Sequence, residues 1–283
     1  MMYAFLTVGD AVPEKLPKVL AEAFDVQIGD IDVSDISELE DRNWDASVSC
    51  EYEVLEGDLQ WSLTVYASET VQHRPPEDQL SLALARRLGS PVFSDWGGGV
   101  PWIRKVALPD GGFTLARVVE SDQGEAGVSV EAAEAPIVEL PNVQVTRFPE
   151  VVRAFEIATP VTDEVLPPGL TGAERKLRGL LVNWERLCVR MGSDWPPSGW
   201  YSAAMYKEDL EYRDTLGASL GDLSDGGAEI KAAVERIDSV FRALTIDDDG
   251  RSISAPGGTG SSSESARPWY WRRRPKTAPW VAD

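Results

Sequence analysis

The chain has 283 residues, of which 43% are hydrophobic, and its formal net charge of -20 comes from 47 acidic against 27 basic residues. This length exceeds the usual size of one domain and the apolar content suffices for ordinary cores, so a globular protein of two modest domains with extensions is predicted. With one histidine, His73, and two cysteines, the chain excludes a disulfide framework, an HExxH motif and a zinc site of the Cys/His type.

Two features of the sequence bear on location. The first ten residues, MMYAFLTVGD, carry no Lys or Arg before a short apolar run, and no stretch reaches the roughly 18 apolar residues of a membrane span. Cys50 and Cys188 are predicted to be buried thiols in separate domains, which suits a reducing compartment. We therefore expect a cytoplasmic protein without a membrane partner.

Residues 1–133 predict an α+β domain, an α/β sandwich of antiparallel hairpins with two helices. The spacing of apolar residues favours helices at 15–24 and 75–90, and the second of these begins with two prolines and ends near a glycine. Alternating apolar residues separated by turn sequences predict strands at 2–8, 47–54, 59–67, 100–108, 112–120 and 127–133.

The pattern changes after this domain. Residues 134–170 are rich in proline and predict a connector. Residues 171–246 predict a small three-helix bundle, because apolar residues recur at helical spacing in three successive runs. Residues 247–266 are rich in Gly and Ser and almost free of large apolar groups, which predicts a flexible linker.

Residues 267–283 form a basic tail that we expect to be disordered. Five cations against Asp283 give it a charge of +4, which leaves -24 on the rest of the chain. Three outcomes stay open: the tail docks on the acidic surface of its own chain, anchors another protein, or remains solvated. The residues predicted to bind a partner are Trp269, Trp271, Arg272, Arg273 and Arg274.

No motif assigns a catalytic residue, a metal or a cofactor. The acidic run at 30–45 does not fit a Ca²⁺ loop, because Ser34 and Asp35 occupy the fifth and sixth positions of that template. His73 stands beside Arg74 and two prolines, a sequence typical of an exposed loop. Paired carboxylates of a hydrolase leave no sequence motif, so that chemistry stays open.

The stretch SDWGGGVPW, 94–102, has three consecutive glycines without the spacing of a phosphate-binding loop. A strand is predicted to follow it, so we expect a flexible surface loop in which Trp96 and Trp102 line a partner or ligand surface. In DWPPSGWY, 194–201, the aromatic residues are predicted to cap the open end of the bundle.

A body this acidic repels nucleic acid and attracts basic proteins. The α+β part around LALARRLGSPVFSD, 82–95, resembles immunity-type proteins of bacterial toxin and conflict systems over about a third of the chain. The resemblance implies a neutraliser of a basic partner protein and carries over no single residue. We therefore expect a non-catalytic interaction module. The alternatives are a hydrolase or transferase using carboxylates in an inter-domain cleft, and a scaffold or regulatory subunit that docks through its Trp/Arg tail.

Overall fold

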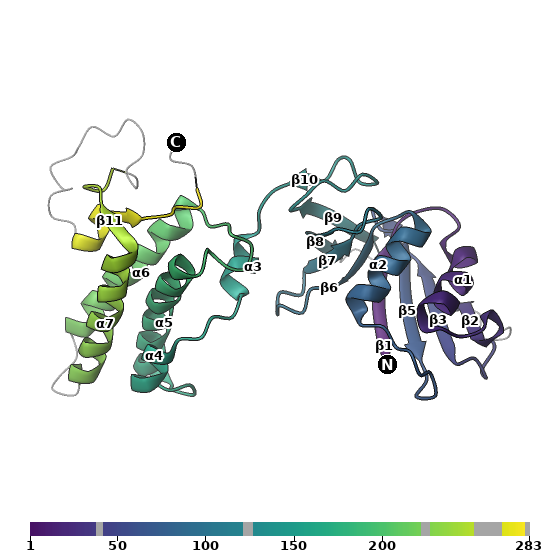
Figure 1. Cartoon of the computed structure of the whole chain (residues 1–283), viewed down its shortest axis with the longest axis horizontal. Helices are drawn as coiled ribbons and strands as arrows, with labels where there is room; N and C mark the ends of the chain where they lie inside the picture. The colour runs from purple at the N-terminus through teal and green to yellow at the C-terminus, as the bar shows by residue number, and fades with distance from the viewer. Residues whose placement is uncertain (38–41, 121–126, 222–226, 252–267, 281–283) are drawn as a thin grey trace. The chain divides into compact units, whose positions relative to one another are not determined.

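The computed structural model describes residues 1–37, 42–120, 127–221, 227–251 and 268–280 (Figure 1). The chain divides into two compact units, Met1–Val151 and Val152–Asp283, called unit 1 and unit 2 below. The expected mixture of helix and strand is confirmed, because the described residues form a large sheet and seven α-helices. Over these ranges, no helix combines the length and the apolar character that crossing a bilayer requires.

Unit 1 is built on a ten-stranded sheet with the order β10-β9-β8-β7-β6-β1-β5-β3-β2, and β4 pairs with β9. The prediction of antiparallel hairpins is wrong at both edges, where β2 runs parallel to β3 and β10 runs parallel to β9. A parallel pair needs a longer connection than a hairpin turn provides. The strands are β1 (Met2–Thr7), β2 (Ile31–Asp35), β3 (Val48–Val54), β4 (Glu56–Gly57), β5 (Trp61–Ala67), β6 (Val92–Asp95), β7 (Ile103–Ala107), β8 (Phe113–Glu120), β9 (Gly127–Ala133) and β10 (Gln144–Val145).

Two helices, α1 (Val12–Phe24) and α2 (Glu77–Leu88), lie together over one face of this sheet (Figure 1). The apolar stripe of α1 and that of α2 are buried against the sheet in one core. From β1, Tyr3 and Phe5 point into this core and are each 2% exposed. The helices thus cover the face to which the odd-numbered residues of β1 belong.

The sheet curves far enough for β4, which follows β3 in the chain, to pair with β9 near the opposite end of the strand order. This contact needs a glycine, because Gly57 has a φ of 103° and a Cβ there would lie 2.5 Å from the carbonyl oxygen of Val128. A second core fills the curve and includes Leu59, Phe93 and Val130. The curve therefore covers the second face over β6–β9.

Over β1, β5 and β3, no helix or strand among the described residues of unit 1 covers the second face in this way. Residues that pair across neighbouring strands share a face, and Met2 is opposite Tyr66, which is opposite Ser49. The next row is Ala4, Thr64 and Glu51. All of these side chains are exposed or half-buried, and this part of the sheet is called the open face below.

Unit 2 is helical. The helix α5 packs against both α6 and α7, and α4 packs against α5 and α7. Leu177, Leu181, Trp184 and Cys188 lie on the buried side of α5, as their spacing predicts. The helices are α3 (Pro149–Ala154), whose residues span the division between the units, α4 (Pro160–Val165), α5 (Gly172–Gly192), α6 (Ala203–Gly221) and α7 (Ala228–Leu244).

The segment predicted as a connector, 134–170, contributes structure to both units. It contains β10, α3 and α4. Phe148 and Val151 are buried in unit 1, and Val152 is buried in the core of unit 2. Its apolar residues therefore take part in the two cores.

The prediction of a disordered tail is wrong for the part that the structure describes. Residues 268–280 form the short helix η4 (Trp269–Arg272) and the strand β12 (Arg273–Pro275), which pairs with β11 (Thr245–Asp247). Burial of Tyr270 and Trp271 in the core of unit 2 supplies the apolar contacts that order the segment. Most of the predicted linker, 252–266, lies outside the described residues.

Candidate functional site

The edge of the sheet at β2 and β3 concentrates negative charge. Between residues 30 and 56 the sequence has ten Asp and Glu residues against a single cation, Arg42. Like charges gathered at one edge create a local negative potential that attracts cationic groups. The described carboxylates of this stretch, called the acidic edge below, are Asp30, Asp32, Asp35, Asp45, Glu51, Glu53 and Glu56.

Arg42 fixes the segment 42–46 against the acidic edge. Its Nη1 donates a hydrogen bond to Glu51 Oε1 at 2.6 Å, and its Nε lies 3.5 Å from Asp32 Oδ2. The amide of Asn43 donates to Asp32 Oδ1 at 2.9 Å. Charge-assisted bonds of this kind are stronger than neutral ones. They hold the segment in place although it has no helix or strand of its own.

A hollow of about 410 Å³ lies beside this segment on the open face. The small side chains Ser49 and Thr64 line it between larger ones. Around them, Met2 is 72%, Trp44 72% and Tyr66 51% exposed. Large apolar side chains exposed next to one another mark a contact surface. The hollow, these three side chains and the acidic edge together form the candidate site.

The exposed residues around the hollow are not identifiable from the sequence. Alternation in β1 and β5 shows that each strand has two faces, but not which face another element covers. The acidic run at 30–45 is the signal that the sequence offers, and its spacing excludes a Ca²⁺ loop without indicating a contact surface. Among the described residues, no group of three or more His, Cys, Asp or Glu side chains is placed to hold a metal ion.

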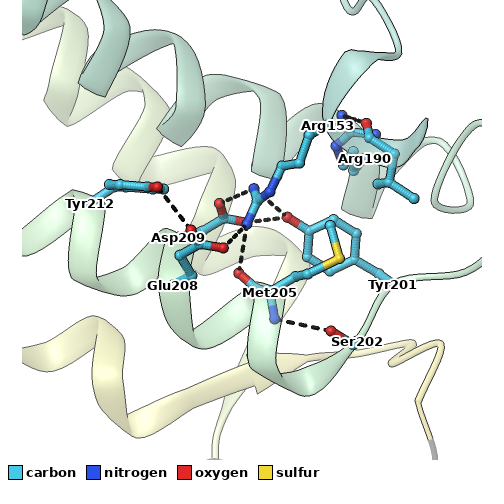
Figure 2. Close-up of polar contacts among 9 residues, drawn as sticks. Arg153, Arg190, Tyr201, Ser202, Met205, Glu208, Asp209 and Tyr212 are labelled. Carbon is cyan, nitrogen blue, oxygen red and sulfur yellow. Dashed lines mark hydrogen bonds and ion pairs between the residues drawn. The ribbon is translucent and has the colours of Figure 1, made fainter. Parts of the chain in front are cut away.

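A second polar cluster lies in unit 2, where it joins α3 to α6 (Figure 2). Arg153 donates from Nη1 to Asp209 Oδ1 at 2.6 Å and to the Tyr201 hydroxyl at 3.0 Å. Its Nη2 donates to Glu208 Oε2 at 2.7 Å. The Tyr201 hydroxyl in turn donates to Asp209 Oδ2.

The inner part of this cluster is enclosed, since Asp209 and Tyr201 are each 1% exposed, whereas Arg153 and Glu208 are partly exposed. Burial raises the pKa of Asp209 above its ordinary value, although Arg153 and the Tyr201 hydroxyl act in the opposite direction. Burial also raises the pKa of Tyr201, and the neighbouring Asp209 adds to the rise. Both oxygens of Asp209 are bonded within the chain, and these bonds anchor α3 to α6.

The tryptophans predicted to bind a partner lie against unit 2 of their own chain. Trp271 is 6% exposed, and its Nε1 donates to Asp214 Oδ2 at 2.9 Å. Trp269 lies edge-on to Phe241, with ring centroids 5.9 Å apart, and the guanidinium of Arg242 is 3.8 Å from its ring centroid. These contacts place both rings in the packing of unit 2.

The three tail arginines that were predicted to bind a partner are also engaged within the chain. Arg272 Nη2 donates to Asp249 Oδ1 at 2.7 Å, and Arg274 Nε lies 3.8 Å from Asp248 Oδ2. Arg273 lies opposite Asp247 in the β11–β12 pair. The acidic run at 247–249 thus faces the basic run at 272–274 across a two-stranded ladder.

Trp96 and Trp102, the predicted surface-loop pair, have different environments. Trp96 packs against the core of Ile103 and Phe148, and its ring lies 2.2 Å from where a Cβ on Gly98 would be. Trp102 is 50% exposed. Neither side chain lines the hollow on the open face.

No family model, no curated protein and no solved structure matched the chain in comparisons with known proteins, so the geometry of the described residues carries the functional conclusion.

Proposed function

We propose that the protein is a non-catalytic interaction module that binds a basic protein through the open face and acidic edge of unit 1. One observation carries the proposal: the acidic edge borders a hollow surrounded by exposed Met2, Trp44 and Tyr66. Charge steers an oppositely charged partner toward the surface, and buried aromatic and apolar side chains then supply most of the binding energy.

The proposal extends to the biological setting. A cytoplasmic protein of the immunity type, acting as neutraliser of a basic toxin, is the sharpest form of it, because the acidic edge matches a cationic surface in charge. Unit 2 is proposed to be a three-helix bundle of α5, α6 and α7 with a structural role, closed by the tail. The enzyme alternative has less support, since the buried carboxylate Asp209 is fully paired.

Charge reversal at the acidic edge tests the proposal. Asp45→Lys with Glu53→Lys changes two exposed carboxylates whose side chains form no ion pair within the part of the chain that the structure describes. The matched control is Glu229→Lys with Glu235→Lys on α7, which changes the net charge equally. Affinity purification from the native cell, with mass spectrometry, is expected to recover a basic protein with the wild type and the control only.

The outcome against the proposal is equally clear. The acidic edge does not contribute to binding if the wild type and the acidic-edge variant recover the same partner. Their dissociation constants, measured by calorimetry, would then agree within twofold. If Trp44→Ala binds the partner with wild-type affinity, the hollow is not part of the binding surface. Truncation of a central aromatic anchor typically weakens binding by about 2 kcal/mol or more.

A further inference from the structure

A second hollow, of about 450 Å³, lies on the same face of the sheet as the first. Leu6, Leu55, Ser62 and Phe93 line it, together with Ala4. The two hollows adjoin, because Ala4 of the second pairs with Thr64 of the first across β1 and β5. They form one trough that runs along β1 and β5, and this surface is called the trough below.

Small side chains line the centre of the trough, and larger side chains line its two ends. Its centre consists of the small side chains Ala4, Ser49, Ser62 and Thr64. Exposed Met2, Trp44 and Tyr66 stand at one end, and half-buried Leu6 and Leu55 lie at the other, next to the buried Phe93. Small residues between large ones let the backbone of a partner approach the sheet closely while its side chains fill the two ends.

The length of the trough matches a short helix. Leu6 is four residue steps along β1 from Met2, which is about 13 Å at the rise of a strand, about 3.3 Å per residue. A helix covers that distance with about nine residues, since it rises about 1.5 Å per residue. Two and a half turns present an apolar stripe of three or four side chains on one side.

An extended segment fits the trough less well. The strand β5 is paired with β1 on one side and with β3 on the other along its whole length. A strand lying over β5 would find no free backbone groups there, and its own amides and carbonyls would lose water without gaining partners. A helix satisfies its backbone internally, so it can cover a sheet face at no such cost.

Charge determines which way the polar side of such a helix faces. Along the β3 side of the trough stand Glu51 and exposed Glu53. Glu51 is paired with Arg42, so among the described residues the unpaired charge on the β3 side is that of Glu53. On the opposite side the trough is lined by Arg104 of β7 and Glu120 of β8, whose charges offset each other. A helix with Lys or Arg beside its apolar stripe therefore has its cations next to β3, and an acidic helix meets repulsion there.

Resting on the proposed function, we propose that the trough receives an amphipathic, basic α-helix of the partner, which completes the sheet as a missing helical layer. The apolar stripe of this helix covers Ala4 and Thr64, and its cationic side faces Glu53. The helix is thus the counterpart, on the open face, of α1 and α2 on the covered face.

Selection of peptides on the full-length protein tests this inference while the partner is unidentified. The probe is a display library of random 16-residue peptides, bound to the wild type and depleted on Ala4→Trp, which fills the centre of the trough. Ser62→Trp serves as a second blocking variant in case Ala4→Trp fails to fold. Val138→Trp, at a position that is 85% exposed and lines neither hollow, is the matched control.

The expected peptides carry apolar residues at i, i+3 or i+4 and i+7 with a net positive charge, and bind at least tenfold more weakly to a trough variant than to the control. NMR of labelled methionine methyl groups locates the site at which the peptides bind. The chain has four methionines, so few signals need to be followed. Met2 is expected to shift on binding, while Met191 and Met205 of unit 2 stay unchanged.

Three results overturn the inference. If the selected peptides have apolar residues at every second position and shift the methyl signal of Met2, the partner segment is not a helix. The proposed function is unaffected by this result. Acidic or neutral peptides that depend on Ala4 refute the charge match and the proposed function together. Basic peptides that bind the trough variants as tightly as the control, with Met2 unmoved, show that the trough is not the docking surface.

Discussion

Buried carboxylates in the described part of unit 2 are held by cations or by hydrogen bonds. Asp209 accepts from Arg153, which also bonds Glu208, and Arg213 bonds both oxygens of buried Asp238 at 3.2 and 2.9 Å. Removing one member of such a pair leaves the other buried without compensation, which costs more than the pair itself contributes. Single residues can therefore decide whether unit 2 folds.

Arg153→Met tests this at the buried cluster. The substitution leaves Asp209 and Tyr201 without their cation, and we expect a loss of about 2 to 3 kcal/mol in the free energy of unfolding, lower than for a fully enclosed pair because Arg153 is a third exposed. Arg236→Met, which breaks an exposed pair with Glu164, is the control and is expected to cost under about 0.5 kcal/mol. If urea denaturation shows that the two variants lose equal free energy of unfolding, the buried cluster around Arg153 does not stabilise unit 2 as proposed.

The buried thiol of Cys50 is expected to make the free energy of unfolding fall at alkaline pH. Burial raises the pKa of Cys50 to about 12, and Glu51 and Asp32 add to the rise. The unfolded thiol loses its proton first, so the stability that the group contributes is complete below pH 9 and is lost as the pH rises toward 12.

Cys50→Ala should therefore lose stability less steeply above pH 9 than the wild type, by up to about 1.4 kcal/mol per pH unit. Urea denaturation at successive pH values measures the two slopes. Parallel slopes, or rapid labelling of the native Cys50 thiol by a disulfide reagent at pH 8, would show that the side chain is accessible.

At the scale of elements, the tail is a part of unit 2. Trp271 and Tyr270 are buried, whereas the ion pairs of Arg272 and Arg274 with the acidic run at 247–249 are partly exposed. Surface ion pairs contribute about 0 to 1 kcal/mol each and weaken in salt, while buried aromatic rings contribute more and do not. Apolar burial therefore dominates the attachment of the tail.

Limited trypsin digestion separates the ionic contribution from the apolar one, because the tail offers Arg272, Arg273 and Lys276 as cleavage sites, whereas Arg274 precedes a proline. Raising NaCl to about 0.5 M should leave the cleavage rate within about twofold of its low-salt value. Trp271→Ala should raise it at least tenfold, since opening of the tail then costs less. A strong salt effect in the wild type would indicate electrostatic attachment.

For the whole molecule, the net charge of -20 is unevenly distributed, with ten carboxylates and one arginine between residues 30 and 56. Repulsion within such a group opposes folding, and salt screens it. The acidic edge is thus expected to reduce the stability of unit 1, as a cost of attracting a cationic partner.

Raising NaCl from about 20 mM to about 500 mM shortens the Debye length from about 20 Å to about 4 Å and should stabilise β3 and β5 by about 0.5 to 1 kcal/mol. Hydrogen exchange of their amides measures this change. Glu53→Gln with Glu56→Gln should reduce the gain, and Glu229→Gln with Glu235→Gln on α7 should not. A loss of protection in salt would mean that ion pairs such as Arg42 with Glu51 outweigh the repulsion.

Local patterns determined much of the element content. The apolar stripe of α5 and the alternation in β3, β5 and β8 appear in the sequence because each buries one side against a single large core. Local patterns do not predict the short strands β4, β10, β11 and β12, and they also miss two longer strands of the main sheet, β2 and β6. The first lies in the acidic run and the second follows α2 without alternation, and both form through pairing with distant strands.

The sequence by itself determined the negative charge, the mixture of helix and strand, and the scarcity of histidine and cysteine ligands, because these follow from composition and local periodicity. Only the tertiary structure decided that the tail packs on unit 2, that Asp209 is enclosed, and that one face of the sheet stays open. Each of those depends on contacts between residues far apart in the chain, and local patterns carry no information about which surface meets which.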